Sequence, residues 1–229
     1  MSLKRLVAWL GWEMIEVSLA EKAVAILGGG VAIGLLLVIT NWALPGPSVI
    51  SVVTSMGASA VLLFAVPHGP LSQPWPVCGG HVLSAIIGVA CARWIAPTAL
   101  AGACAVGLAI GAMIQCRCIH PPGGATALAA VIGRAAIRDR GFDFVWCPVA
   151  LNALVMVILA VAVNFPFRWR RYPAILSRAP RPVPVPVAGR ALTHDEIAAA
   201  VRSLDSFIDI SEEDLVRLVN RLCPPPEKP

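Results

Sequence analysis

The sequence predicts an all-α membrane protein with about six transmembrane segments. Of its 229 residues, 58% are hydrophobic and only 14% are charged, and the mean hydropathy is +0.78. Because a soluble globular domain is about one-quarter charged, this composition indicates that most of the chain lies in a bilayer. Several apolar runs approach the roughly 20 residues that cross the hydrocarbon core as a helix. The apolar segments are residues 24–44, 48–66, 77–95, 98–115, 121–134 and 145–165.

Prolines mark the connection at residues 67–76 and the start of the fifth apolar segment. The turn at residues 67–76 contains four prolines, which predicts a rigid, non-helical connection. The fifth segment, residues 121–134, is the shortest and begins at Pro121-Pro122. Proline is favoured in the first turn of a helix, because the first N–H groups have no partner within the helix. This segment is therefore either a short span or a half-helix that enters the membrane and breaks.

An internal match suggests a repeat. Gly57-Ala-Ser-Ala in the second segment corresponds to Gly124-Ala-Thr-Ala in the fifth, and Leu83-Ser-Ala corresponds to Leu151-Asn-Ala at nearly the same offset. Three spans per copy would invert the second copy, and inverted repeats with broken helices around a midplane site are a recurrent transporter plan. The match predicts helix breaks near Gly57 and at Pro121. Chance matches among small residues at helix-packing faces remain the alternative.

The two ends of the chain differ from the predicted transmembrane domain, residues 23–167. Residues 1–22 have apolar side chains at helical spacing, which predicts an amphipathic helix in the interfacial layer. Residues 168–190 are basic and proline-rich and predict an extended linker, and residues 191–229 carry capping-box patterns that predict a small helical tail. With an even number of spans, the Lys- and Arg-rich ends share one side, which would be the cytoplasm. We expect a multi-pass protein of the cell inner membrane.

The segment Cys116-Arg-Cys-Ile-His-Pro-Pro-Gly-Gly-Ala-Thr126 is the sharpest local motif. Glycines allow a ligand to approach the backbone, Thr126 adds a hydroxyl donor, and a helix N-terminus favours anions. His120 titrates near neutral pH unless its surroundings shift it, so we expect a pH-sensitive site. The alternative is a tight interfacial turn in which the histidine is structural. Both interpretations stay open at this point.

Other polar residues within the apolar segments extend the candidate site. His81 follows two glycines near the start of the third segment, and Ser59 and Asn152 lie inside spans, where polar side chains are costly to bury. Cys116, Cys118 and His120 offer soft metal ligands, but alternate residues do not share a helix face, so we expect no metal and no cofactor. The spans lack a carboxylate pair, a nucleophile–base set or a P-loop, so we do not expect an enzyme.

These motifs resemble those of the HPP family of integral membrane proteins. The resemblance rests on His120-Pro-Pro followed by Gly-Gly-Ala-Thr, on Gly57-Ala-Ser-Ala-Val-Leu-Leu-Phe, on Pro70-Leu-Ser-Gln-Pro-Trp and on Gly79-Gly-His-Val-Leu-Ser, which occur in the family's order. Plastid and cyanobacterial relatives are associated with nitrite transport. The resemblance therefore implies a small monovalent anion as substrate, with nitrite first.

We accordingly expect a transporter or channel for a small monovalent anion. The alternative is a membrane-anchored regulatory or assembly module whose tail recruits a partner. The expected partners are the anion and the lipid bilayer but no nucleic acid, and the stripes of Gly and Ala would permit a homodimer. The candidate substrate-binding residues are His120, Pro121, Pro122, Gly123, Gly124, Thr126, Gly57, Ser59, His81 and Asn152.

Overall fold

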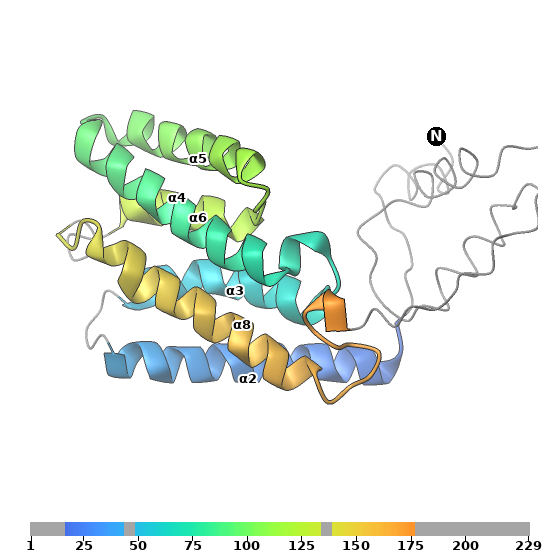
Figure 1. Ribbon diagram of the computed structural model, residues 1–229. Coiled ribbons are helices and arrows are strands. Elements are labelled where there is room, and N and C mark those ends of the chain that lie inside the picture. Colours follow the sequence, from blue (N-terminus) through green and yellow to red (C-terminus); the bar gives the residue numbers. More distant parts are fainter. Residues whose placement is uncertain (1–16, 44–48, 134–138, 177–229) are drawn as a thin grey trace, which may run out of the picture. The chain divides into compact units, whose positions relative to one another are not determined.

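The computed structural model describes residues 17–43, 49–133 and 139–176, and within these ranges the protein is all-α (Figure 1). Every apolar segment predicted from the sequence contains a helix. The α-helices are α2 (Leu19–Ala43), α3 (Val49–Ala65), α4 (Pro74–Trp94), α5 (Thr98–Gln115), α6 (Pro121–Ile132) and α8 (Leu151–Asn164). Shorter turns of helix are η1 (Pro70–Ser72), the π-helix η2 (Val145–Ala150) and η3 (Ala174–Leu176).

Four of the described helical segments are long and apolar enough to cross a membrane: Leu19–Trp42, Pro74–Trp94, Thr98–Gln115 and Val145–Asn164. The apolar helices Thr54–Ala65 and Pro121–Ile132 are shorter. The chain is therefore a multi-pass membrane protein. Helix α2 begins at Leu19, a little before the first predicted segment. Most of the predicted interfacial helix and the whole predicted tail lie outside the described residues.

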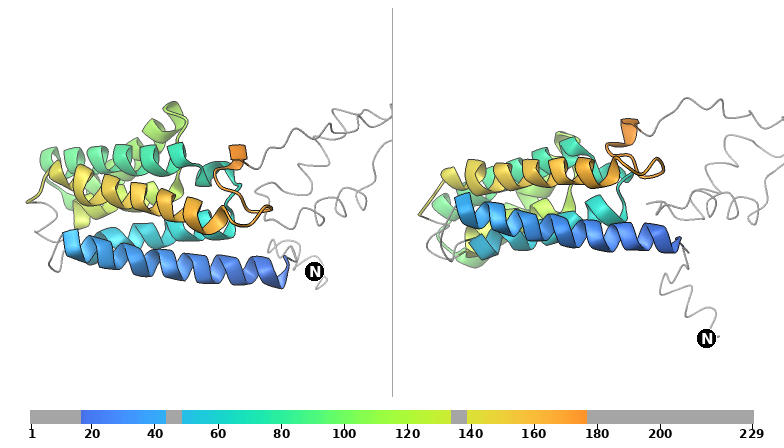
Figure 2. Two further views of the ribbon diagram at one scale, coloured as in Figure 1. Left: turned by 60° about the horizontal axis from the view of Figure 1, so that its bottom comes forward. Right: turned by 90° about the horizontal axis from the view of Figure 1, so that it is seen from below.

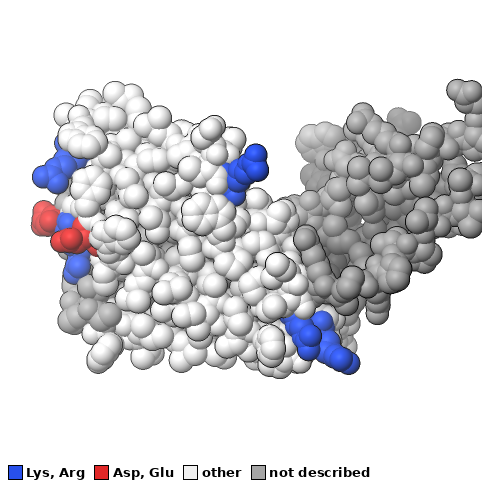
Figure 3. All heavy atoms as spheres, in the orientation of Figure 1, with Lys and Arg blue, Asp and Glu red and all other residues white. Residues whose placement is uncertain are grey.

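The charged side chains of the described residues lie near the ends of the helices. Arg93 is in the last turn of α4 and Arg117 follows α5, while Asp139, Arg140 and Asp143 precede η2. Figure 3 shows an uncharged band between the charged ends on the face that it draws. Such a band is what a helical bundle presents to the hydrocarbon core of a membrane.

The two predicted helix breaks have different outcomes. The break at Pro121 is confirmed, because α6 begins there. The break near Gly57 is wrong, because α3 runs without interruption from Val49 to Ala65. One glycine weakens a helix by only about 1 kcal/mol, whereas broken backbone hydrogen bonds in hydrocarbon cost several kcal/mol each.

A break that we did not predict lies in the sixth segment. Cys147 has a non-helical backbone (φ −135°, ψ 107°) within η2, and Pro148 follows it. The ring of a proline disfavours helical geometry at the residue before it and removes one N–H donor. The chain therefore enters α8 through a kink at the proline.

Helices α4 and α6 pack closely against each other in the bundle. A Cβ atom added to Gly88 would lie 2.5 Å from the Ala127 carbonyl oxygen, and one added to Gly123 would lie 2.9 Å from the Gly80 carbonyl oxygen. No side chain fits at these positions, so the two helix backbones approach closely. On the other side of the bundle α2 lies beside α8, as Figures 1 and 2 show.

The segment after α8 folds back onto the bundle. Arg170 is 1% exposed and donates hydrogen bonds to the Asn164 side chain and to the Phe64 carbonyl at the end of α3. Tyr172 is fully buried, and its hydroxyl donates to the Ser72 carbonyl over 2.8 Å. The first residues of the stretch that we predicted as a linker therefore pack with the helices.

Candidate functional site

Four buried polar side chains from three helices meet at one place in the bundle. Ser59 comes from α3, His81 from α4, and His120 and Thr126 from the start of α6, and none is more than 1% exposed. The Ser59 hydroxyl oxygen lies 2.8 Å from His81 Nε2 and 2.9 Å from His120 Nε2. Thr126 Oγ1 lies 2.7 Å from His81 Nδ1, and the Leu71 carbonyl oxygen lies 2.8 Å from His120 Nδ1. We call these four side chains the histidine cluster.

The local sequence explains why these side chains can meet. His120 is the N-cap of α6 with an extended backbone (φ −141°, ψ 101°), and the two prolines that follow start the helix directly after it. Gly80 lies beside His81 on α4, and a Cβ there would be only 2.6 Å from the His120 Cβ. The absence of that side chain lets the imidazole rings approach to a centroid distance of 4.9 Å, edge to face.

The directions of the hydrogen bonds follow from the Leu71 carbonyl, which can only accept. His120 Nδ1 must therefore carry a proton, and in the neutral ring its Nε2 is an acceptor. The Ser59 hydroxyl donates to that Nε2, so its oxygen is free to accept from His81 Nε2–H. His81 Nδ1 is then an acceptor, and the Thr126 hydroxyl donates to it.

The hydroxyl groups of Ser59 and Thr126 also lie near backbone carbonyls of their own helices, but at longer distances. Ser59 is 3.3 Å from the Ser55 carbonyl, and Thr126 is 3.4 Å from the Pro122 carbonyl. Both distances exceed those to the histidine nitrogens, and hydrogen bonds from hydroxyl groups are strongest near 2.7–2.8 Å. The neutral cluster thus has one self-consistent arrangement, directed from Thr126 to Leu71.

The surroundings keep the cluster neutral. Burial lowers the pKa of His120, in the connection before α6, to about 4, and the hydrogen bond to the Leu71 carbonyl opposes part of that shift. Burial raises the pKa of the Cys118 thiol, which packs on Gly79 of α4. Among the described residues, no Asp or Glu hydrogen-bonds to or pairs with either imidazole.

The cluster contains four of the residues predicted from the sequence, and the others lie elsewhere or pack the helices. Pro121 and Pro122 open α6 and have no N–H, and the Gly123 N–H donates to the His120 carbonyl over 2.8 Å. Gly123 packs on α4 rather than leaving space for a ligand. A Cβ added to Gly124 or Gly57 would meet nothing within 4 Å, so neither position faces another element closely.

Asn152 belongs to a different buried contact. It is fully buried on α8, where the Thr40 hydroxyl of α2 lies 2.8 Å from its Oδ1. The same hydroxyl lies 2.7 Å from the Leu36 carbonyl, and a single hydroxyl proton cannot serve both acceptors fully. In this arrangement Asn152 Nδ2 has no hydrogen-bond partner. The structure therefore separates Asn152 from the histidine cluster.

The sequence did not indicate the residues that position the hydrogen-bond acceptor of His120. Leu71 contributes only its carbonyl. The carbonyl of the next residue, Ser72, accepts from the Tyr172 hydroxyl, and the Ser72 hydroxyl lies 2.7 Å from the Val66 carbonyl and 3.0 Å from the Leu62 carbonyl. The prediction that residues 67–76 are non-helical is wrong, because this stretch contains η1 and its last three residues begin α4. Nothing in the sequence indicates which carbonyl a buried histidine will face.

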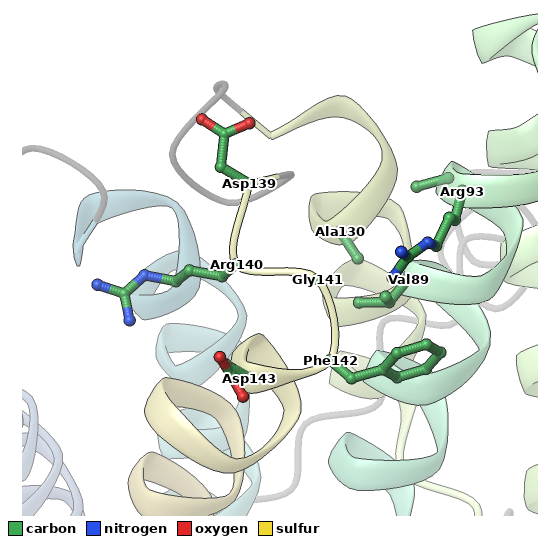
Figure 4. A pocket seen from close by; sticks show the side chains of 9 residues that line it. Val89, Arg93, Ala130, Asp139, Arg140, Gly141, Phe142 and Asp143 are labelled. Carbon is green, nitrogen blue, oxygen red and sulfur yellow. The ribbon is translucent and has the colours of Figure 1, made fainter.

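A pocket of about 410 Å³ lies away from these residues, at the end of the bundle where α4 ends (Figure 4). In Figure 4 the Arg93 side chain extends toward Gly141, whereas Arg140 points away from it. The lining combines two arginines with two aspartates, Asp139 and Asp143, so its charges balance. The charges described for this pocket therefore give it no net attraction for an anion. No group of three or more metal-ligating side chains occurs among the described residues.

The fold defines a multi-pass helical membrane protein. Residues 14–173 match the family described as HPP, transmembrane region, and the chain belongs to that family. Two transmembrane proteins of Dictyostelium discoideum are 46% and 45% identical to it over 123 residues, 52% of this chain. The chain covers only 39% and 43% of their lengths. No solved structure matches it.

Proposed function

We propose that this protein is a transporter or channel for a small monovalent anion, with nitrite as the first candidate. Membership of the HPP family is consistent with transport in general. The observation that carries the proposal is the histidine cluster, which gathers two imidazoles and two hydroxyl groups inside an apolar bundle. Polar groups within a membrane are expensive to bury and typically serve an ion or substrate pathway.

The chemistry of the cluster suits a small anion better than a cation. Among the described residues it offers no carboxylate, and its side chains provide hydroxyl and imidazole donors. The N-terminus of α6, which begins at Pro121, adds the positive end of a helix dipole. Its first N–H groups contribute little, since two are absent at the prolines and Gly123 is bonded to His120. The donors proposed for the anion are therefore the side chains.

The internal sequence match also favours a transporter. Ser59 and Thr126 occupy corresponding positions of the two Gly-Ala-Ser/Thr-Ala segments, and their hydroxyl groups contact the two nitrogens of one ring, that of His81. Related positions in inverted repeats converge on a shared site in several transporter folds. We propose that α2–α4 and α5–α8 are such repeats and that the protein lies in a cell inner membrane with the Lys- and Arg-rich ends of the chain in the cytoplasm.

Uptake by liposomes that contain the purified protein tests this function. Nitrite, nitrate, chloride and bicarbonate are each supplied outside, with protein-free liposomes as background. We expect saturable nitrite uptake and at least a tenfold loss of uptake in Thr126→Val, which removes one donor. Gly107→Ala on α5, where a Cβ meets nothing within 4 Å, is the matched control.

Liposomes that stay inert to all four anions, with protein that is monodisperse and correctly folded, would contradict transport. They would favour the alternative of a membrane-anchored module whose tail recruits a partner.

A further inference from the structure

We infer that the cluster takes up one proton with each anion, so that transport is an electroneutral 1:1 symport with a relay from His81 through Ser59 to His120. This inference rests on the proposed anion transport and names its coupling ion. The argument begins with the number of protons in the cluster. The donors are the Thr126 hydroxyl, His81 Nε2–H, the Ser59 hydroxyl and His120 Nδ1–H.

Each of these donors already has an acceptor, three in the cluster itself and one at the Leu71 carbonyl. Thr126 donates to His81, His81 to Ser59, Ser59 to His120, and His120 to the Leu71 carbonyl. The neutral cluster therefore has no spare donor for an anion. An anion that entered without a proton would have to break one of these bonds and remain without a counter-charge, both of which are costly in an apolar interior.

One added proton supplies both the missing donor and the missing positive charge. Protonation of His81 Nδ1 makes that nitrogen a donor, and the Thr126 hydroxyl oxygen can accept from it. The Thr126 hydroxyl proton is then free to turn toward an anion. The cluster gains one donor and one positive charge in the same step, which matches one monovalent anion.

The Ser59 hydroxyl allows this charge to pass between the histidines. When Ser59 gives its proton to His120 Nε2, it receives the proton of His81 Nε2, so both nitrogens exchange roles and no proton is lost. His81 becomes neutral with its proton on Nδ1, and His120 becomes the imidazolium. Its Nδ1–H remains on the Leu71 carbonyl throughout. The positive charge thus moves from His81 on α4 to His120 at the start of α6.

None of the described groups that face the imidazoles can neutralise an imidazolium, so the anion must supply the negative charge. They are the Ser59 and Thr126 hydroxyl groups from α3 and α6, and the Leu71 carbonyl from the turn before α4. Cys118 in the α5–α6 connection stays a neutral thiol at neutral pH, because burial raises its pKa. Arg117 is exposed and positive, and so cannot serve as a counter-ion for an imidazolium.

Proteoliposomes measure the coupling directly. Nitrite or nitrate uptake and internal pH are followed together, while valinomycin and potassium set the membrane potential. Protein-free liposomes supply the passive flux of nitrous acid, and nitrate has no such background. We expect one proton per anion, a rate that changes less than twofold with potential, and uptake that rises with an inward proton gradient.

His120→Gln separates the relay from folding. The glutamine amide can donate to the Leu71 carbonyl and accept from Ser59, so the neutral cluster persists, but it cannot take up the relayed proton. We expect at least a tenfold loss of gradient-driven uptake with an unchanged melting temperature at pH 8, and a similar loss of uptake in Ser59→Ala. Gly107→Ala is again the control.

Uptake that follows the membrane potential with no proton movement, and is unchanged in His120→Gln, would overturn the coupling while leaving anion transport in place. A folded wild-type protein that transports none of the anions at any pH would overturn the proposed function and the coupling with it.

Discussion

The histidine cluster and the Thr40–Asn152 pair are both polar contacts between apolar helices, but they use their hydrogen-bonding atoms differently. In the cluster every side-chain nitrogen and oxygen has a partner. In the pair, Asn152 Nδ2 has none. The comparison teaches that a buried polar residue in a span is not by itself a functional site. A closed, directed network of titratable groups is a stronger indication than one costly amide.

Acid should produce the largest difference between the two contacts. The pKa of His120 is about 4 in the folded protein and about 6.5 when unfolded. Above pH 6.5 His120 is neutral in both the folded and the unfolded protein, so its contribution to the free energy of unfolding does not change. As the pH falls from 6.5 to 4, His120 takes up a proton mainly in the unfolded chain. The folded state therefore loses roughly 3 kcal/mol by pH 4, according to the shift in the pKa of His120.

Thermal unfolding in detergent, without added anions, measures this loss. His120→Gln has no such group and should lose less stability on acidification than the wild type, whereas Asn152→Leu should follow the wild-type curve. Parallel curves for the wild type and His120→Gln would show that His120 does not titrate between these limits.

Gly80→Ala should have the next largest effect, because it acts on the cluster through packing. The new Cβ would lie 2.6 Å from the His120 Cβ and 3.0 Å from the Cys118 carbonyl oxygen, neither of which is the end of a flexible side chain. We expect a destabilisation of about 1–3 kcal/mol. Gly107→Ala should be neutral or slightly stabilising, since its Cβ meets nothing within 4 Å and alanine favours helices. Equal melting temperatures for the two variants would refute the close packing of α4 on His120.

The Thr40–Asn152 pair should show the smallest effects. Thr40→Val removes the only hydrogen bond described for the Asn152 amide and should cost about 0.6 kcal/mol, the average for polar contacts between membrane helices. Asn152→Leu removes the donor that has no partner and should be close to neutral. A loss above about 2 kcal/mol in Asn152→Leu, measured by thermal unfolding, would mean that its amide is fully satisfied in the membrane.

The sequence predicted the residues of the cluster better than their geometry. Pro121-Pro122 correctly indicates the start of a helix, and the structure brings together four of the candidate residues, His81, His120, Ser59 and Thr126. Their type and position in apolar segments were sufficient, because polar groups within a bilayer are rare and need partners.

The errors came from glycine and proline, whose roles depend on neighbours that the sequence does not show. Gly57 was expected to break α3, but the helix continues through it. Gly123 was expected to let a ligand approach the backbone, but its missing side chain instead lets α4 pack against it. Pro148 lay within the sixth segment as an available signal for the kink at Cys147. The buried roles of Arg170 and Tyr172 had no local signal, because they arise only when the chain folds back.

The positions of the imidazole protons test the central claim most directly. Nitrogen-15 NMR of labelled histidine, assigned with single His→Gln variants, distinguishes which ring nitrogen carries the proton. Without anion, the account predicts a neutral His120 protonated on Nδ1 and a neutral His81 protonated on Nε2, as the Leu71 and Ser59 contacts require. Saturating nitrite should convert one ring to an imidazolium. If both rings instead remain neutral with nitrite bound, or if His120 carries its proton on Nε2 in the anion-free protein, the directed network and the coupling built on it are wrong.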